Sequence, residues 1–132
     1  MRNFYNSAPS LSPNGTKMAF ISEQDGVFVI AIMDDLDDIK TIRPLVSSFR
    51  RQDFEDLNML SPGITWSPDG KQIAISAKAG GQDAIFITDA ETGAYKKLTW
   101  GIKAIQSVQW SPDGTKLAFI GSKDEQTDIY TY

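Results

Sequence analysis

The segment Trp66-Ser67-Pro68-Asp69-Gly70-Lys71-Gln72-Ile73-Ala74-Ile75 decides the fold. Proline presets the backbone for the first central position of a tight turn, aspartate tolerates the second, and glycine takes the left-handed position that follows. The residues on either side of this turn are rich in aromatic and β-branched types, which favour strands. The segment therefore predicts a strand, a tight turn and a second strand.

The same unit occurs three times in the chain. An isoleucine follows each turn glycine at an offset of 15 residues, at Ile30, Ile85 and Ile129. Such internal repetition indicates a repeat architecture. In each copy the serine can also bond back to the turn backbone. We therefore assign a structural role to the three turns, Ser12-Pro13-Asn14-Gly15, Ser67-Pro68-Asp69-Gly70 and Ser111-Pro112-Asp113-Gly114.

Each copy contains up to four predicted strands. The first strands are expected at 8–11, 63–66 and 107–110, the second at 18–22, 73–77 and 117–120, and the third at 27–33, 84–88 and 128–132. A fourth is visible twice, at 41–46 and 96–100. Four short antiparallel strands in about 40–45 residues are typical of one blade of a β-propeller. The predicted fold class is therefore all-β, with three blades of four antiparallel strands, the third lacking its last strand.

The spacing of the turns sets the expected blade boundaries. Pro13 and Pro68 lie 55 residues apart, whereas Pro68 and Pro112 lie 44 apart, so the first copy carries 11 additional residues. Matching Leu45 to Leu98 assigns two of these to the loop after the third strand and nine to residues 47–62. We expect blade one at about 8–46, an insertion at 47–62, blade two at about 63–100 and an incomplete blade three at about 107–132.

The composition excludes several function classes. The 132 residues include neither cysteine nor histidine, so disulfides, zinc fingers, a Cys–His nucleophile and a Ser–His–Asp triad are impossible within this chain. With 13 Lys plus Arg against 17 Asp plus Glu, nucleic-acid binding through phosphate neutralisation is not expected. No apolar run approaches the roughly 20 residues that span a bilayer, and residues 1–7 contain no apolar signal core.

The repeat resembles a known family. Trp-Ser-Pro-Asp-Gly-x-x-(Ile/Leu)-Ala-(Phe/Ile), followed by Ile-Phe or Ile-Tyr and then Lys-Leu-Thr, is similar to the WD-like repeat of TolB-type β-propellers. The resemblance covers essentially the whole chain and is specific for fold but not for function. The first copy departs from the pattern, with Leu11 in place of tryptophan and Asn14 in place of aspartate.

The resemblance implies a ring of six blades, of which this chain would supply half. Neither end of the sequence contains the fourth strand of blade three. We therefore expect an open strand edge at 128–132 and an uncovered face on blade one, both prone to pairing. Two hypotheses follow: a homodimer that closes a six-bladed ring, or a piece of a longer protein.

Some conspicuous residues have structural explanations. Asp69 and Asp113 belong to the repeated turns, and Trp66 and Trp110 occupy matching positions that favour packing between blades over ligand stacking. The cluster Asp34-Asp35-Leu36-Asp37-Asp38 offers oxygen ligands for Ca²⁺, but its spacing matches no EF-hand, so a solvated hairpin loop is favoured. We predict no catalytic residue, cofactor or metal site.

The insertion is the strongest candidate for binding. In a propeller, the loops from the fourth strand to the next blade share a face with the loops from the second to the third strand, and binding residues concentrate on such loops. Arginines and aromatic residues are also over-represented at binding hot spots. The competing interpretation is that the insertion tucks over blade one while its charges stay solvated. The candidate partner-binding residues are Phe49, Arg50, Arg51, Asp53, Phe54, Glu55 and Asp56, with Trp100 and Lys103 as weaker candidates on the same face.

We predict a non-enzymatic module that binds a protein, a peptide or another ligand through the loops around its channel mouth. The alternatives are the substrate-gating propeller of a prolyl-oligopeptidase-like peptidase, and a structural or designed half-propeller whose partner is itself. The resemblance also implies a periplasmic location, which nothing in this chain encodes. A carboxylate-based activity is chemically conceivable, but outside the insertion no Asp or Glu pair departs from the repeat.

Overall fold

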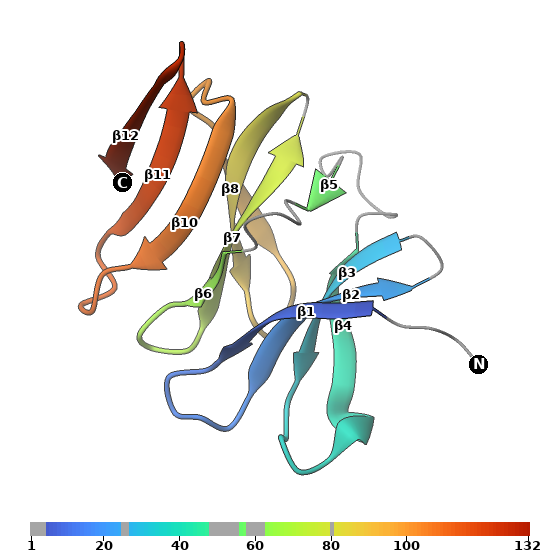
Figure 1. Ribbon diagram of the computed structural model, residues 1–132. Coiled ribbons are helices and arrows are strands. Elements are labelled where there is room, and N and C mark those ends of the chain that lie inside the picture. Colours follow the sequence, from blue (N-terminus) through green and yellow to red (C-terminus); the bar gives the residue numbers. More distant parts are fainter. Residues whose placement is uncertain (1–4, 25–26, 48–55, 58–62, 80) are drawn as a thin grey trace.

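The computed structural model describes residues 5–24, 27–47, 56–57, 63–79 and 81–132, which form three antiparallel sheets arranged side by side (Figure 1). One 3₁₀ helix, η1 (Ile39–Thr41), is the single helical element among these residues. None of the described helical residues forms a helix with the length and apolarity needed to cross a bilayer.

Each sheet corresponds to one copy of the repeat. The first contains β1 (Tyr5–Leu11), β2 (Met18–Gln24), β3 (Val27–Met33) and β4 (Ile42–Ser47), in that order. The second contains β5 (Asp56–Leu57), β6 (Ile64–Trp66), β7 (Gln72–Ala79), β8 (Gln82–Asp89) and β9 (Tyr95–Leu98). The third contains β10 (Ala104–Trp110), β11 (Leu117–Lys123) and β12 (Gln126–Thr131). The predicted fold class, all-β with propeller blades and a third blade of three strands, is confirmed.

The three Ser-Pro-Asx-Gly turns share one hydrogen-bond pattern. In each, the glycine N–H donates to the serine carbonyl at 2.8–2.9 Å, and the glycine φ is +71° or +72°. The serine hydroxyl donates to the side-chain oxygen of the third turn residue, Asn14, Asp69 or Asp113, at 2.6–2.7 Å. Asn14 replaces aspartate in the first turn without loss of this bond, because its amide oxygen is the acceptor.

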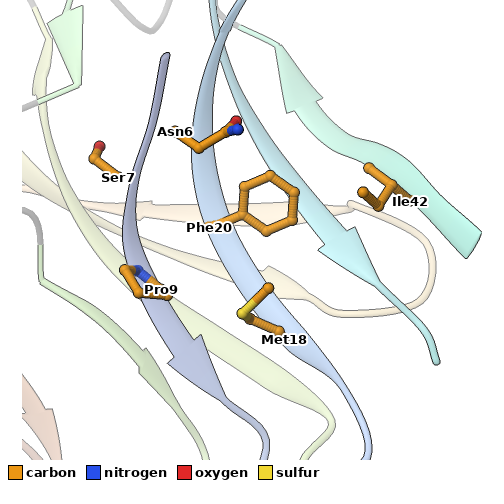
Figure 2. A pocket seen from close by; sticks show the side chains of 6 residues that line it. All are labelled: Asn6, Ser7, Pro9, Met18, Phe20 and Ile42. Carbon is orange, nitrogen blue, oxygen red and sulfur yellow. The ribbon is translucent and has the colours of Figure 1, made fainter. Parts of the chain in front are cut away.

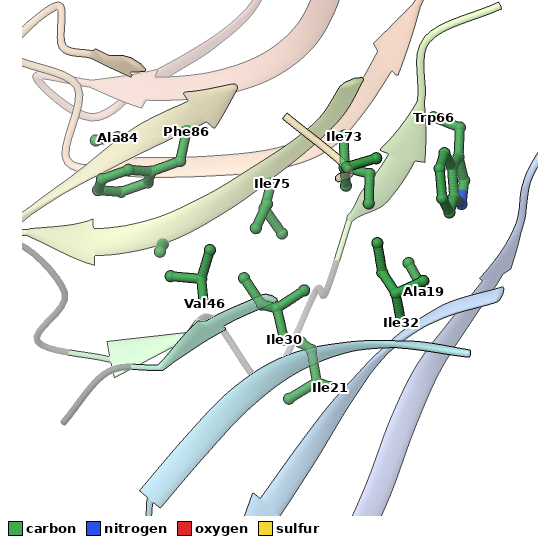
Figure 3. Close-up of a cluster of buried hydrophobic side chains, with 12 residues drawn as sticks. Ala19, Ile21, Ile30, Ile32, Val46, Trp66, Ile73, Ile75, Ala84 and Phe86 are labelled. Carbon is green, nitrogen blue, oxygen red and sulfur yellow. The ribbon is translucent and has the colours of Figure 1, made fainter. Parts of the chain in front are cut away.

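The blades are held together by apolar side chains that alternate along the strands. Every second residue of β2 and of β3 faces the second sheet and packs against residues of β6, β7 and β8 (Figure 3). The opposite face of the second sheet packs against β10 and β11 in a second cluster. We call the packed interface between two neighbouring blades a seam. At the first seam, between blades one and two, the buried Trp66 indole N–H donates to the Ser10 carbonyl at 2.9 Å, so this tryptophan joins two blades.

Part of the expected insertion belongs to blade two. β5 pairs with β7 through Asp56–Lys78 and Leu57–Ala77, whereas β6 pairs with the same edge of β7 through residues 64–66. These pairs match Ala104–Ser122 and Ile105–Gly121 in the third sheet. The second sheet therefore begins at Asp56 rather than at residue 63, and its first strand is divided into two short segments.

The strand register also corrects the assignment of the additional residues. Ile30 pairs with Val46 and Ile85 pairs with Leu98, so Val46 and not Leu45 is equivalent to Leu98. The pairing of β3 with β4 shifts between Ile30 and Ala31, a β-bulge that the sequence spacing concealed. Three additional residues therefore precede Val46, and eight fall between Val46 and Trp66.

The pKa values of the turn aspartates make the stability of the fold depend on pH. The hydrogen bond from the Ser111 hydroxyl, together with bonds from Thr115, lowers the pKa of Asp113 to about 2. The Ser67 hydroxyl and the Lys71 backbone N–H lower the pKa of Asp69 in the same way. A carboxyl whose folded pKa is depressed stabilises the fold above its unfolded pKa of about 3.9, and this stabilisation is lost as the pH falls.

Replacing Asp113 by asparagine should leave the urea midpoint unchanged at pH 7, because Asn14 already makes the same bonds in the first turn. Between about pH 4 and pH 2 the midpoint of Asp113→Asn should fall less than that of the parent chain, because one titrating group has been removed. Asp113→Ala serves as the control and should lower the midpoint at pH 7. Equal acid sensitivity of Asp113→Asn and the parent would contradict this account.

Candidate functional site

One end of the sheets carries the connections from the second to the third strands and from one blade to the next. Lys78, Lys103 and Lys123 are all exposed at this end, as are Asp124 and Glu125. The ion pairs found among the described residues, Lys17–Asp34 and Arg43–Asp34, involve none of these five side chains. We call this surface the loop face and define it by these five residues.

The loop face of blade three ends in a two-residue turn. Lys123 pairs with Gln126, and the intervening Asp124 and Glu125 have φ values of +49° and +65°. Both central residues of such a hairpin turn require positive φ, which favours glycine and tolerates aspartate but is unfavourable for glutamate. The matching position in blade two is Gly81, with φ of +76°, and the sequence places Gly26 there in blade one. Glu125 is therefore held in a conformation that the other copies assign to glycine.

Most of the predicted binding residues lie outside the described residues. These are Phe49, Arg50, Arg51, Asp53, Phe54 and Glu55. The structure assigns Asp56 to β5, where its backbone is paired with Lys78. Binding through the insertion therefore stays a prediction.

The two weaker candidates differ in their surroundings. The Trp100 ring lies 4.9 Å from Phe119 and 5.5 Å from Tyr132, measured between centroids, so it packs between blades two and three. Lys103 has an exposed side chain, and its backbone N–H donates to the Ser122 carbonyl at 3.0 Å. Of these two, Lys103 presents its side chain to solvent on the loop face, whereas Trp100 contributes to the seam.

The acidic cluster at the opposite end of blade one stabilises its own loop and the seam. Asp34 accepts hydrogen bonds from Lys17 at 2.9 Å and from Arg43 at 2.5 Å. The Arg43 hydrogen bond is the main cause of the lowered pKa of Asp34, and the bond from Lys17 adds to it. The guanidinium of Arg43 also donates to the carbonyls of Ala90 and Glu91 in blade two, at 2.9 and 3.2 Å. Arg43 therefore connects two blades, a role that the sequence did not reveal.

The role of the Asp83 side chain, at the start of β8, was also not apparent from the sequence. It is buried, and its Oδ2 accepts the backbone N–H of Ile105 in β10 at 2.8 Å, across the seam between blades two and three. The matching residues in the other copies are Phe28 and Thr127. The sequence signal for this role is that Asp83 places a carboxylate at a repeat position where the other two copies have uncharged residues.

Comparison with known proteins agrees with this geometry. No protein-family model matches the chain. A TolB homologue from Chlorobium luteolum is 32% identical over 122 residues, which cover 92% of this chain and 25% of that protein. The crystal structure of TolB from Acinetobacter baumannii superposes with a TM-score of 0.76 at 24% identity, over 97% of this chain and 29% of that one. The chain is built from TolB-type β-propeller blades.

A second solved structure shares this fold. The β-propeller domain of the Trilobed protease from Pyrococcus furiosus superposes with a TM-score of 0.71 at 23% identity, over 100% of this chain and 40% of that domain. This likeness shows the fold. The chain spans a quarter of the C. luteolum relative, so TolB-type blades describe its architecture and not the activity of a whole protein.

Replacing Asp83 by alanine should lower the free energy of unfolding by about 1–3 kcal/mol, because the buried Ile105 amide loses its acceptor. Asp83→Asn keeps an oxygen at this position and should cost less. Lys123→Ala, on the exposed loop face, provides the control and should stay within about 0.5 kcal/mol of the parent. Urea unfolding at pH 7 measures all three, and an Asp83→Ala variant as stable as the parent would refute the assigned role.

Proposed function

We propose that this chain is a non-enzymatic propeller module that binds a protein partner through its loop face. The observation that carries the proposal is the turn at Asp124 and Glu125. Backbone strain that persists in a fold is a sign of function, because a glycine at the same position would relieve it. Glu125 occupies a left-handed position at the tip of an exposed hairpin, where the other two copies have glycine.

At the opposite end of the sheets, unlike at the loop face, acidic side chains are bonded within the fold. There the side chains of Asp69, Asp89 and Asp113 accept hydrogen bonds within their own turns, and Asp34 accepts bonds from Lys17 and Arg43. These carboxylates are therefore already engaged in hydrogen bonds that stabilise the fold. The charged groups of the loop face are exposed on a rigid scaffold, which is the usual arrangement of a binding surface.

The proposal assigns no catalytic role to the turn carboxylates, for chemical reasons. The chain has no cysteine or histidine, and the turn carboxylates have depressed pKa values that suit hydrogen-bond acceptors and not proton donors near neutral pH. The relatives support a protein partner. The Tol-Pal system protein TolB from Francisella tularensis is 36% identical over 69 residues, which cover 50% of this chain and 16% of that protein, and its name assigns it to the Tol-Pal system. A periplasmic location is part of the same proposal.

A second candidate function is supported by one observation. The propeller domain of a protease matches the full length of this chain. In that case the blades would form part of a substrate-gating propeller, and the partner at the loop face would be a catalytic domain. In both cases the propeller would be completed by self-association or by the rest of a longer protein.

A photo-crosslinking amino acid at position 103 or 123 tests the loop face directly. Expressed in its native host, the chain should form a specific protein crosslink from these positions, and Lys123→Glu should weaken the crosslink from position 103. Crosslinkers at 71 and 116, exposed on the turns at the opposite end, are the matched controls. Mass spectrometry of the product separates the two functions, since a peptidase catalytic domain would support gating. A crosslink from the control positions alone would contradict the proposal.

Replacing Glu125 by glycine should stabilise the chain while weakening that crosslink. Relief of the left-handed conformation, offset by the added freedom of glycine in the unfolded chain, should raise the free energy of unfolding by about 0.5–1 kcal/mol. Urea unfolding and the crosslinking yield from position 103 measure the two effects. A Glu125→Gly variant that is more stable and crosslinks as well as the parent would show that the strain serves no binding role.

A further inference from the structure

The first Ser-Pro-Asx-Gly turn differs from the other two in a way that gives it a chemistry of its own. It contains Asn14-Gly15, the single Asn-Gly dipeptide of the chain, and both residues are exposed. The backbone nitrogen that follows an asparagine can attack the side-chain amide carbon, and glycine hinders this attack least because it has no Cβ. We propose that Asn14 is a deamidation site, that the closed turn restrains the reaction, and that the turn accepts the aspartate product.

The reaction consumes water and needs no other co-reactant. The Gly15 nitrogen gives its proton to hydroxide and forms a bond to Cγ of Asn14, the Cγ–Nδ2 bond breaks, and Nδ2 takes a proton from water and leaves as ammonia. Water then opens the cyclic imide. Opening at Cγ gives aspartate, whereas opening at the backbone carbonyl gives isoaspartate, in which the main chain runs through Cγ. Either product adds one carboxylate, and therefore one negative charge, to the chain at neutral pH.

The folded turn holds both reacting groups. The Gly15 N–H, whose proton has to leave, donates to the Ser12 carbonyl at 2.8 Å. The Asn14 Oδ1 accepts the Ser12 hydroxyl at 2.7 Å, and it accepts the Thr16 hydroxyl and backbone N–H at 2.9 and 3.2 Å. Ring closure breaks the bond between Gly15 and Ser12, and the bonds to Oδ1 fix the direction of the side-chain amide. We therefore expect Asn14 to react from the open turn.

The third turn already has the structure of the aspartate product. Asp113 Oδ1 accepts the Ser111 hydroxyl at 2.6 Å, and it accepts the Thr115 hydroxyl and backbone N–H at 2.8 and 3.0 Å. These donors match, residue for residue, those that hold the Asn14 oxygen. The glycine φ is +72° in both turns. Aspartate at position 14 can therefore accept the same three bonds on the same backbone.

Isoaspartate does not fit this turn. The Ser12 N–H donates to the Lys17 carbonyl at 2.9 Å, and the Lys17 N–H donates to the Ser12 hydroxyl at 3.0 Å, so these two residues close a loop of fixed length. An isoaspartyl residue adds one carbon atom to the main chain within that loop. Its free carboxylate is attached at Cα, so no oxygen is left at the position that Ser12 and Thr16 now bond. The turn therefore discriminates between the two products.

Asn6 is an internal reference for the reaction. It is the other asparagine among the described residues, it is exposed on β1, and together with Met18 and Phe20 it borders an apolar hollow (Figure 2). The residue that follows it is Ser7, whose side chain hinders attack by the backbone nitrogen. In the unfolded chain Asn14 should therefore react faster than Asn6.

Mass spectrometry of peptides that contain Asn14 tests the proposal, with the chain aged at pH 8 either folded in buffer or unfolded in guanidinium chloride. Deamidation of Asn14 should be about tenfold or more slower in the folded chain, as expected when the turn is open in a tenth of the molecules or fewer. Ser12→Ala removes a donor to Asn14 and should accelerate the reaction several-fold in the folded chain alone. Ser111→Ala, the same change in the third turn, is the matched control and should leave the rate at Asn14 unchanged.

The fate of the products is measured separately. Asn14→Asp has the aspartate product from the start and should have the urea midpoint of the parent at pH 7. Chains aged in guanidinium chloride, refolded and treated briefly with a protease should survive with aspartate at position 14, whereas the isoaspartyl chains should be cleaved.

Any of three results would overturn the proposal. Equal rates at Asn14 in the folded and unfolded chain, or equal rates in Ser12→Ala and Ser111→Ala, would show that the turn does not restrain the reaction. An Asn14→Asp variant less stable than the parent, or isoaspartate retained among the survivors, would show that the turn does not select the product. Circular dichroism checks folding, and Thr16→Ala, which removes one hydroxyl donor to Asn14, is the milder variant if Ser12→Ala does not fold. None of these measurements involves a partner, so they are independent of the loop-face crosslinks.

Discussion

The structure depends on the fact that every blade has two apolar faces, and each needs a neighbouring blade to cover it. A sheet whose strands are apolar on both sides cannot leave one side in water without cost, because burial of apolar area is the main favourable contribution to folding. The second sheet satisfies this requirement with buried isoleucines, alanines and Phe86 facing the two seams. On the outer face of the first sheet, Phe20, Ala31 and Met33 form a smaller buried cluster, whereas Leu11 and Ile129, which lie outside the two seams, are exposed.

The seams also explain how the ends of the blades differ. At one end, Arg43 joins blade one to blade two through backbone carbonyls, and the turn carboxylates are used by their own turns. Towards the other end, Asp83 ties β8 to β10. Charged groups that hold the blades together therefore lie within the seams, and the loop face keeps exposed charges on a fixed frame. The charged side chains that join the blades are therefore different from those exposed at the loop face, where Glu125 has a left-handed backbone conformation.

The repeated Ser-Pro-Asx-Gly turn was enough to predict the blades, because local turn chemistry and apolar periodicity agree in all three copies. The division of the first strand of blade two was not predictable, because β5 has two residues and its assignment depends on pairing with Ala77 and Lys78. The equivalence of Val46 with Leu98 was hidden by a bulge, which sequence spacing does not register. The role of Asp83 depends on an amide 22 residues away, and long-range contacts of this kind require the folded chain.

The central claim is that each blade is stabilised by the blades beside it, and native-state hydrogen exchange tests it most directly. Local opening free energies are highest where an element is covered on all sides and lowest at free edges. The amides of β7 and β8, in the sheet covered on both faces, should therefore exchange about tenfold or more slowly than those of β12, which pairs with β11 on one side alone among the described strands. Equal protection of β8 and β12 would contradict the account, because it would show that blade stability does not depend on a neighbour.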